Sequence, residues 1–130
     1  PNYANFPDGR FSNEAEIELF FLEWLEKNNY HYDLYSDFDF HTHPELLRKY
    51  DVVVINGHSE YWSKEMFDGL EYFVDHGGNL ISLSANEIYA KVTFKDDIME
   101  TYRALPTGGY THSQTGEPGG LWTDTLNRSE

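Results

Sequence analysis

The sequence predicts a three-layer α/β sandwich with a mostly parallel sheet. Residues 51–56 read Asp-Val-Val-Val-Ile-Asn, a continuous β-branched run that is typical of a strand buried on both faces of a parallel sheet. Segments with helical and strand periodicity alternate along the chain with short connections, and right-handed crossovers then place helices over parallel strands. The 130 residues are enough for one hydrophobic core.

The N-terminal part predicts a loop followed by a helix. Residues 1–12 bring Pro, Asp and Gly together and are expected to form the loop. Asn13 is suited to cap the helix, with Glu16 in the capping-box position. Apolar residues then recur at helical spacing, at Ile17, Phe20, Phe21, Trp24 and Leu25. The asparagine pair at 28–29 is expected to end this helix.

The next segments predict a strand, a polar loop and a short helix. Residues 31–35 alternate with a period of two, which favours a strand. Residues 37–43 carry Asp or His at every second position and are expected to form a loop. Pro44 fits the first position of a short helix that runs to Lys49.

The middle of the chain predicts a strand–helix–strand unit. After the strand at 51–56, residues 57–62 are expected to form the loop at its carboxyl end. Ser63 is expected to cap a helix with one apolar stripe, and the glycine pair at 77–78 ends it in the left-handed conformation. Residues 79–84 predict the next strand.

The C-terminal part has a weaker pattern. Residues 96–105 predict a short helix, and the glycine-rich residues 106–130 predict loops with one strand near Leu121 and Trp122. We therefore expect a loop over residues 1–12, an α/β domain over 13–105 and a loop-rich tail over 106–130 that continues into a larger parent chain.

The composition excludes several classes of function. Nine basic residues against twenty-three acidic ones give a formal charge of −14, so no basic surface for nucleic acid is expected. No apolar run approaches the length of a membrane span, and an anionic membrane would repel the chain. The chain has no cysteine, which excludes disulfides, thiolate metal sites and a cysteine nucleophile.

Polar side chains follow the predicted strands at their carboxyl ends, where ligands bind in flavodoxin-like sheets. His58 and Glu60 are two residues apart directly after the first buried strand, a spacing that suits a metal-ligand pair or an acid–base pair acting on one water. Asn86 and Glu87 follow the neighbouring strand, where an amide can orient a substrate carbonyl. The alternative is that Glu60 only favours the helix dipole and Asn86 only forms a turn.

A second polar group lies in the loop predicted at 37–43. If this segment were extended, Asp37, Asp39, His41 and His43 would point to one face and could hold zinc or a harder metal. The same residues also fit a solvated loop that leads into the next helix.

The sequence from Tyr50 to Ser63 resembles a known family, with the motif Gly-His-x-Glu-Tyr-Trp-Ser at 57–63. Further matching segments are Phe-Leu-Glu-Trp-Leu-Glu at 21–26, Gly-Gly-Asn-Leu at 77–80, Ser-Ala-Asn at 84–86 and Gly-Leu-Trp at 120–122. These residues are similar to the large (β) subunit of N,N-dimethylformamidase and its relatives. The matching stretch, from about Glu14 to Phe94, resembles the domain of that subunit shaped like a class I glutamine amidotransferase.

The resemblance implies an amidohydrolase that cleaves small N-substituted formamides to an amine and formate. The family holds a mononuclear iron with two tyrosines and one glutamate. By resemblance Glu60 is the iron ligand, His58 acts on the attacking water and Asn86 orients the substrate. The tyrosine ligands are expected upstream of Pro1, because the surroundings of Tyr3 do not match the family.

An iron-dependent amide hydrolase, acting within a longer protein, is therefore the leading hypothesis. Glutaminase chemistry is excluded because this chain lacks the cysteine nucleophile. The alternatives are a non-catalytic glutaminase-like binding module and a zinc enzyme built on residues 37–43. The expected partners are a small amide substrate, a small subunit and a second copy of the chain, in the cytoplasm, and the isolated piece is expected to be inactive.

Overall fold

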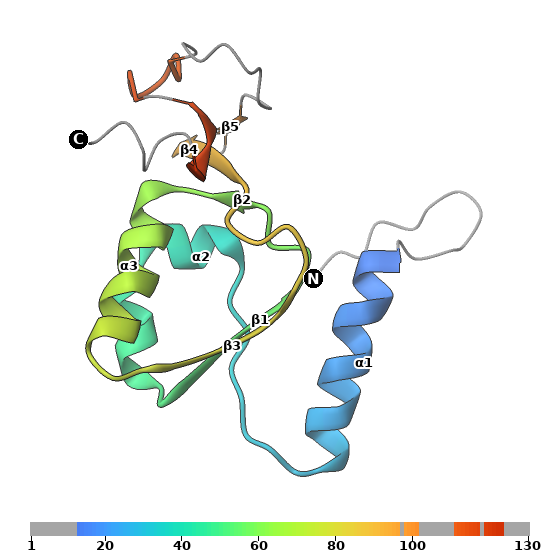
Figure 1. The fold of residues 1–130 in the computed structure, drawn as a ribbon. Coiled ribbons are helices and arrows are strands. Elements are labelled where there is room, and N and C mark those ends of the chain that lie inside the picture. Colours follow the sequence, from blue (N-terminus) through green and yellow to red (C-terminus); the bar gives the residue numbers. More distant parts are fainter. Residues whose placement is uncertain (1–12, 97, 102–110, 118, 124–130) are drawn as a thin grey trace.

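The computed structural model describes residues 13–96, 98–101, 111–117 and 119–123 (Figure 1). The loop predicted at 1–12 and much of the tail predicted at 106–130 lie outside these residues. The elements in chain order are α1 (Asn13–Lys27), α2 (Asp37–Thr42), the 3-10 helix η1 (Pro44–Lys49), β1 (Val52–Gly57), β2 (Tyr61–Trp62), α3 (Lys64–Asp75), β3 (Asn79–Ser84), β4 (Ala90–Lys95), β5 (Ile98–Thr101) and β6 (Gly120–Leu121).

The predicted strand–helix–strand unit is confirmed. β1 and β3 pair in parallel, with Val52 opposite Asn79 and Gly57 opposite Ser84, and α3 connects them. The Ser63 hydroxyl caps α3 by accepting a hydrogen bond from the Met66 amide. The helix ends where Gly77 takes a φ of +91°, a conformation that glycine adopts at little cost.

The hydrophobic core lies between α3 and the surrounding strands. Its buried side chains are Leu47, Trp62, Met66, Leu70, Phe73 and Trp122. Trp122 stacks on Phe67 with ring centroids 4.6 Å apart and donates a hydrogen bond from Nε1 to the Trp62 carbonyl at 3.1 Å. The C-terminal end of the described chain is therefore anchored on the core through one tryptophan.

The remaining strands form a mixed sheet. β2 pairs with β4 in parallel, whereas β5 and β6 both pair with β4 in antiparallel fashion. β6 confirms the strand predicted near Leu121. The structure is thus a mixed α/β fold, as predicted, but its strands divide between a parallel pair and this second sheet. A flavodoxin-like sandwich of three layers stays a prediction.

The loop predicted at 57–62 is wrong at its end, because Tyr61 and Trp62 form β2, paired with β4. Three further predicted segments are wrong. Residues 31–35 form no strand, because no described strand pairs with them. Residues 37–42 form helix α2, since Ser36 and Asp39 make a reciprocal capping box at its start. The helix predicted at 96–105 is wrong over its described residues, because Ile98–Thr101 form β5, paired with Val92–Lys95 of β4.

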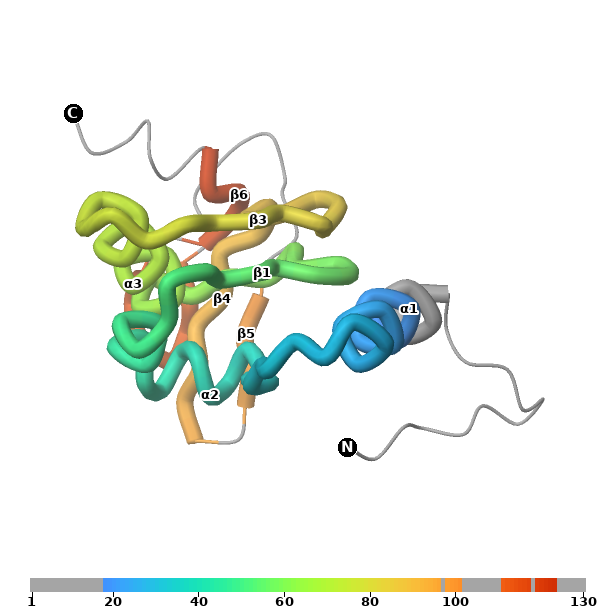
Figure 2. The backbone as a smooth tube through the Cα atoms, turned by 90° about the horizontal axis from the view of Figure 1, so that it is seen from below, coloured from blue at the N-terminus to red at the C-terminus, as the bar shows by residue number. Residues whose placement is uncertain are grey.

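The two faces of the β1–β3 pair have different surroundings. Val53 and Ile55 pack against the core, whereas Ile81 and Leu83 on β3 are exposed. Figure 2 shows α1 beyond the carboxyl end of β1, on the side of the molecule away from α3. No described helix has the length and apolar character that a membrane crossing requires.

Candidate active site at the end of strand β1

The site begins at Gly57, the last residue of β1. Its φ of +83° turns the chain sharply, and the glycine itself is buried. A Cβ atom at this position would lie 2.5 Å from Oε1 of Glu18 on α1. Only glycine fits here without displacing that side chain, and the turn carries the chain away from the strand into His58, Ser59 and Glu60.

Hydrogen bonds hold this loop against the loop that follows β3. The Ser59 amide donates to Oγ of Ser84 at 2.9 Å, and the Ile88 amide donates to the Ser59 carbonyl at 3.1 Å. The amide of Ala90 donates to the Glu60 carbonyl at 2.8 Å. Because these bonds fix both backbones, the side chains that the two loops carry are held at defined positions.

The predicted residues His58, Glu60 and Asn86 meet at one point. Nδ1 of His58 lies 3.0 Å from Oε1 of Glu60, and Nδ2 of Asn86 donates a hydrogen bond to the same oxygen at 3.4 Å. The side chain of Glu60 is 19% exposed and that of His58 is 37% exposed. Glu60 is thus the more buried of the two side chains, and the imidazole of His58 is the more exposed one.

This arrangement sets the chemistry of the imidazole. A carboxylate beside Nδ1 favours the tautomer in which Nδ1 carries the proton, which leaves Nε2 as a proton acceptor. Asn86 has two N–H groups on Nδ2, and the bond to Glu60 uses one of them. The group therefore combines a base, a carboxylate and an amide donor.

The loop after β3 is strained at two positions. Asn86 has a φ of 52° and Ile88 a φ of 53°, both in the left-handed region. Asparagine tolerates this conformation, but a β-branched isoleucine there is uncommon and costs of the order of 1–3 kcal/mol. The strained backbone directs the Asn86 side chain toward Glu60 and the Ile88 amide toward Ser59.

Glu87, the other predicted residue of this loop, has different surroundings. Its Oε2 accepts a hydrogen bond from the Ser82 hydroxyl at 2.7 Å, so the side chain folds back along β3. Its Oε1 is buried and has no hydrogen-bond partner among the described residues. The structure does not join Glu87 to the group formed by His58 and Glu60.

The predicted group at residues 37–43 is not assembled, because α2 turns its side chains in different directions. Asp39 bonds to Ser36, His43 lies 3.4 Å from a carboxylate oxygen of Glu45, and His41 approaches Ser63 and Glu65 through Nδ1 at 2.9 and 3.3 Å. Desolvation raises the pKa of the Asp37 carboxyl. Within the described ranges, no three His, Asp or Glu side chains lie close enough together to hold a metal ion.

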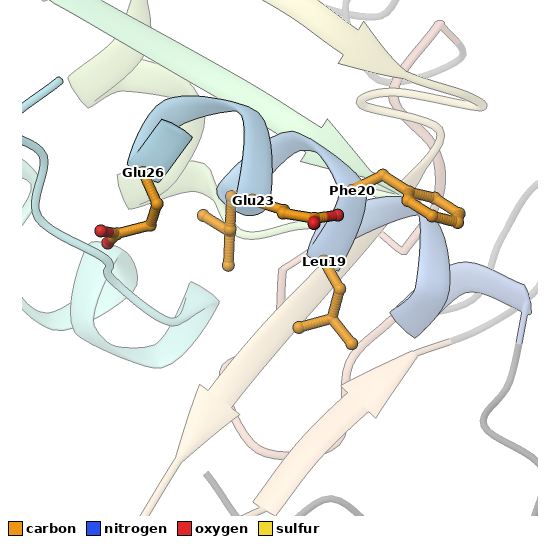
Figure 3. Close-up of a pocket in the computed structure, with 5 residues that line it drawn as sticks. Leu19, Phe20, Glu23 and Glu26 are labelled. Atoms are coloured by element: carbon orange, nitrogen blue, oxygen red, sulfur yellow. The ribbon is translucent and has the colours of Figure 1, made fainter. Parts of the chain in front are cut away.

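A hollow of about 560 Å³ lies along α1 (Figure 3). All of its lining residues belong to one face of that helix: Leu19, Phe20, Leu22, Glu23 and Glu26. Because a single helix surface forms it, we regard it as a surface groove. It contains none of the residues predicted for the site.

Sequence reasoning missed two residues that the structure places at the site. Ser84 anchors the loop of Ser59, and its position at the carboxyl end of β3 is the signal that could have identified it. Glu18 contacts Gly57 across the fold. The sequence gives no signal for this contact, because Glu18 is one of several glutamates in the predicted helix.

The fold and the site together define an α/β domain with a histidine, a carboxylate and an amide gathered at the end of a parallel strand. Comparison with protein-family models then gives the particular family. The chain belongs to the family described as N,N-dimethylformamidase beta subunit-like, C-terminal, whose model matches residues 1–130. This confirms the resemblance found in the sequence, whereas the likeness to class I glutamine amidotransferases stays a prediction.

Two curated relatives show the same relationship. The chain is 31% identical to the N,N-dimethylformamidase beta subunit of Alcaligenes sp and 30% identical to that of Paracoccus aminophilus. Each alignment covers 82% of this chain and 16% of the relative. The chain thus spans about a sixth of the length of these proteins.

Proposed function

We propose that this chain is the part of an amide hydrolase that carries the water-activating group, and that the whole protein cleaves small N-substituted formamides. The observation that carries this proposal is the meeting of His58, Glu60 and Asn86 on one carboxylate oxygen. Family membership supports the reaction type, since both curated relatives are named as N,N-dimethylformamidase beta subunits. A small subunit and a second copy of the chain belong to the same proposal.

In the proposed reaction, Nε2 of His58 takes a proton from a water that attacks the formyl carbon. Glu60 holds the imidazole in the required tautomer and stabilises its positive charge. Asn86 donates an N–H group to the substrate oxygen as negative charge develops there. The carbon–nitrogen bond then breaks and the nitrogen takes both protons of the water, so that the products are formate and an ammonium ion.

The iron of the resemblance also stays a proposal. Glu60 would be its ligand in this chain, and a bound metal would supply Lewis-acid chemistry. One carboxylate is not a complete site, and the described part of the chain contains no cluster of three metal-binding side chains. The residues described do not by themselves fit the ion, so no step above depends on it.

The test uses the complete gene product and measures amine release from N,N-dimethylformamide. We expect His58→Ala and Asn86→Ala each to lower kcat by about 10²-fold or more, in line with the loss of a general base or an oxyanion donor. The control is His31→Ala, because His31 is exposed and lies in the connection between α1 and α2. Iron content is measured in parallel for Glu60→Ala.

Each outcome of this test has a clear meaning. Loss of iron in Glu60→Ala with normal folding would support the ligand assignment, and unchanged iron would contradict it. Full activity in both His58→Ala and Asn86→Ala would contradict the proposed site and favour a non-catalytic module.

A further inference from the structure

A buried tryptophan is hydrogen-bonded to the loop that carries His58 and Glu60. The side chain of Trp62 is 1% exposed, and its ring meets that of Phe40 at 89° with centroids 5.7 Å apart. Its indole N–H donates to two oxygens of Ser59, the carbonyl at 2.8 Å and Oγ at 3.0 Å. A buried indole N–H needs a partner within the protein, and here Ser59 is that partner.

Ser59 stands between His58 and Glu60, so its two peptide groups determine how these side chains face each other. The peptide group on the side of His58 contains the Ser59 amide, which donates to Oγ of Ser84 at 2.9 Å. This bond to the end of β3 fixes the direction of the first peptide group.

The peptide group on the side of Glu60 is held by two donors. The Ser59 carbonyl accepts from the indole of Trp62 at 2.8 Å and from the amide of Ile88 at 3.1 Å. A carbonyl oxygen has two lone pairs, and these two donors use both of them. The shorter bond is the one from Trp62, which follows Ser59 by three residues and thus closes the turn of the loop.

The tryptophan is itself fixed in the hydrophobic core. Its backbone carbonyl accepts a hydrogen bond from Nε1 of Trp122 at 3.1 Å, and in the pairing of β2 with β4 it lies opposite Lys91. A side chain in a close-packed interior keeps one position, because its neighbours leave no room for another. The loop therefore takes its position from the core.

We propose that Trp62 is a positioning residue of the site, whose indole N–H fixes the peptide group between Ser59 and Glu60 and so keeps the Glu60 carboxylate beside Nδ1 of His58. This inference rests on the proposed amide hydrolysis, in which that carboxylate orients the imidazole that takes a proton from water. Trp62 acts through these residues and needs no contact with the substrate. Without the N–H the peptide group can rotate, and a small misplacement of a general base lowers kcat.

The experiment compares two tryptophans in the complete gene product, with N,N-dimethylformamide as the substrate. Trp62→Phe keeps an aromatic ring in the core and removes the N–H. We expect it to lower kcat about 10-fold and to change KM by less than about 2-fold. If this variant does not fold, benzothienylalanine is incorporated at position 62 with the same expected result, because this isostere keeps the double ring and has sulfur in place of the N–H.

The matched control is Trp122→Phe. It makes the same change at a second buried tryptophan, whose N–H donates to the Trp62 carbonyl and not to the loop of Ser59. Both variants lose a buried hydrogen bond, so both should lower the melting temperature. Only the change at position 62 should lower kcat.

A double-mutant cycle with His58→Ala gives a readout that a merely structural role would not move. When the imidazole is absent, the loop has no general base to misplace. Trp62→Phe should therefore lower the residual kcat of His58→Ala by less than about 2-fold. A tryptophan that only stabilises the fold would lower kcat equally in both backgrounds.

The failure of this inference can be told apart from the failure of the proposed function. A wild-type protein that does not hydrolyse N,N-dimethylformamide contradicts the proposed function, and this inference with it. When the wild type is active, each of three results overturns the role of Trp62 alone. They are full kcat in the variant at position 62, an equal loss of kcat in Trp122→Phe, and an equal loss in the His58→Ala background.

Discussion

At the scale of single residues, the site depends on one glycine. Gly57 combines a left-handed backbone with the absence of a Cβ atom, and the place of that atom is taken by Glu18. Gly77 shares the left-handed backbone, with a φ of +91°, but nothing lies within 4 Å of its Cβ position. A comparison of alanine substitutions at the two glycines therefore separates the free-energy cost of the left-handed backbone from the cost of displacing Glu18.

We expect Gly57→Ala to destabilise the chain more than Gly77→Ala. Each substitution should cost about 1–2 kcal/mol for the left-handed conformation of alanine. Gly57→Ala should cost more, because Glu18 must move as well. Urea unfolding of both variants measures the difference, and equal free energies of unfolding would contradict the packing of Glu18 on Gly57.

At the scale of elements, the capping box at Ser36 explains why the alternating polar residues 37–42 form helix α2 and not a loop. The Asp and His residues at 37–43 predict an extended loop only if the preceding serine is ignored. Ser36 accepts a hydrogen bond from the Asp39 amide at 3.2 Å, and the Asp39 carboxylate accepts one from the Ser36 amide at 3.0 Å. These two bonds satisfy amides at the start of α2 and favour the helix.

Replacing Ser36 should weaken α2 in a pH-dependent manner. The hydroxyl and the amide of Ser36 lower the pKa of the Asp39 carboxyl in the folded chain. A lowered pKa stabilises the fold above the unfolded value near 3.9, and this contribution is lost as the pH falls through the folded pKa. Ser36→Ala should therefore cost about 1 kcal/mol at pH 7 and less at pH 3.

The measurement is urea unfolding of wild type and Ser36→Ala at both pH values. Ser36→Thr is the matched control, because threonine keeps the hydroxyl that caps the helix. An identical loss at pH 7 and pH 3 would show that the Asp39 carboxylate contributes nothing to the cap.

Elements defined by local pattern were predictable, and those defined by a distant partner were not. The run at 51–56 predicted β1, which spans Val52–Gly57, and the glycine pair at 77–78 predicted the end of α3. The segment 98–101 is a strand only because β4 lies beside it, and residues 31–35 lack such a neighbour. Pairing of this kind is a tertiary effect that single-sequence periodicity does not contain.

The same distinction holds for the candidate site. His58, Glu60 and Asn86 were predicted together, because the carboxyl ends of parallel strands meet at one edge of a sheet. Glu18 was not, because its contact with Gly57 depends on how α1 crosses the end of β1.

At the scale of the whole molecule, the β1–β3 pair has a covered face and an open face. The β-branched run of β1 predicts burial on both sides, but on the outer face Val54 is half-buried and three apolar side chains are exposed: Val52 is 45%, Ile81 46% and Leu83 46% exposed. Ile81 and Leu83 are two residues apart and point to the same side of β3. This is a contiguous apolar surface on the described part of the chain.

We expect the isolated 130-residue chain to associate through this surface and to bind hydrophobic dyes. The double variant Ile81→Lys and Leu83→Lys should lower both dye fluorescence and the apparent mass measured by light scattering. Lys49→Glu is a control for charge on a surface helix. Unchanged association in the double variant would contradict the assignment of this face.

The short distance in sequence between the site residues has a consequence for the order of folding. The bond from Asn86 to Glu60 spans 26 residues, and this segment directly follows β1 and contains β2, α3 and β3. Closing so short a segment costs little chain entropy. The histidine, the carboxylate and the amide can therefore come together while the chain is still being synthesised, before Trp122 reaches its place on the core.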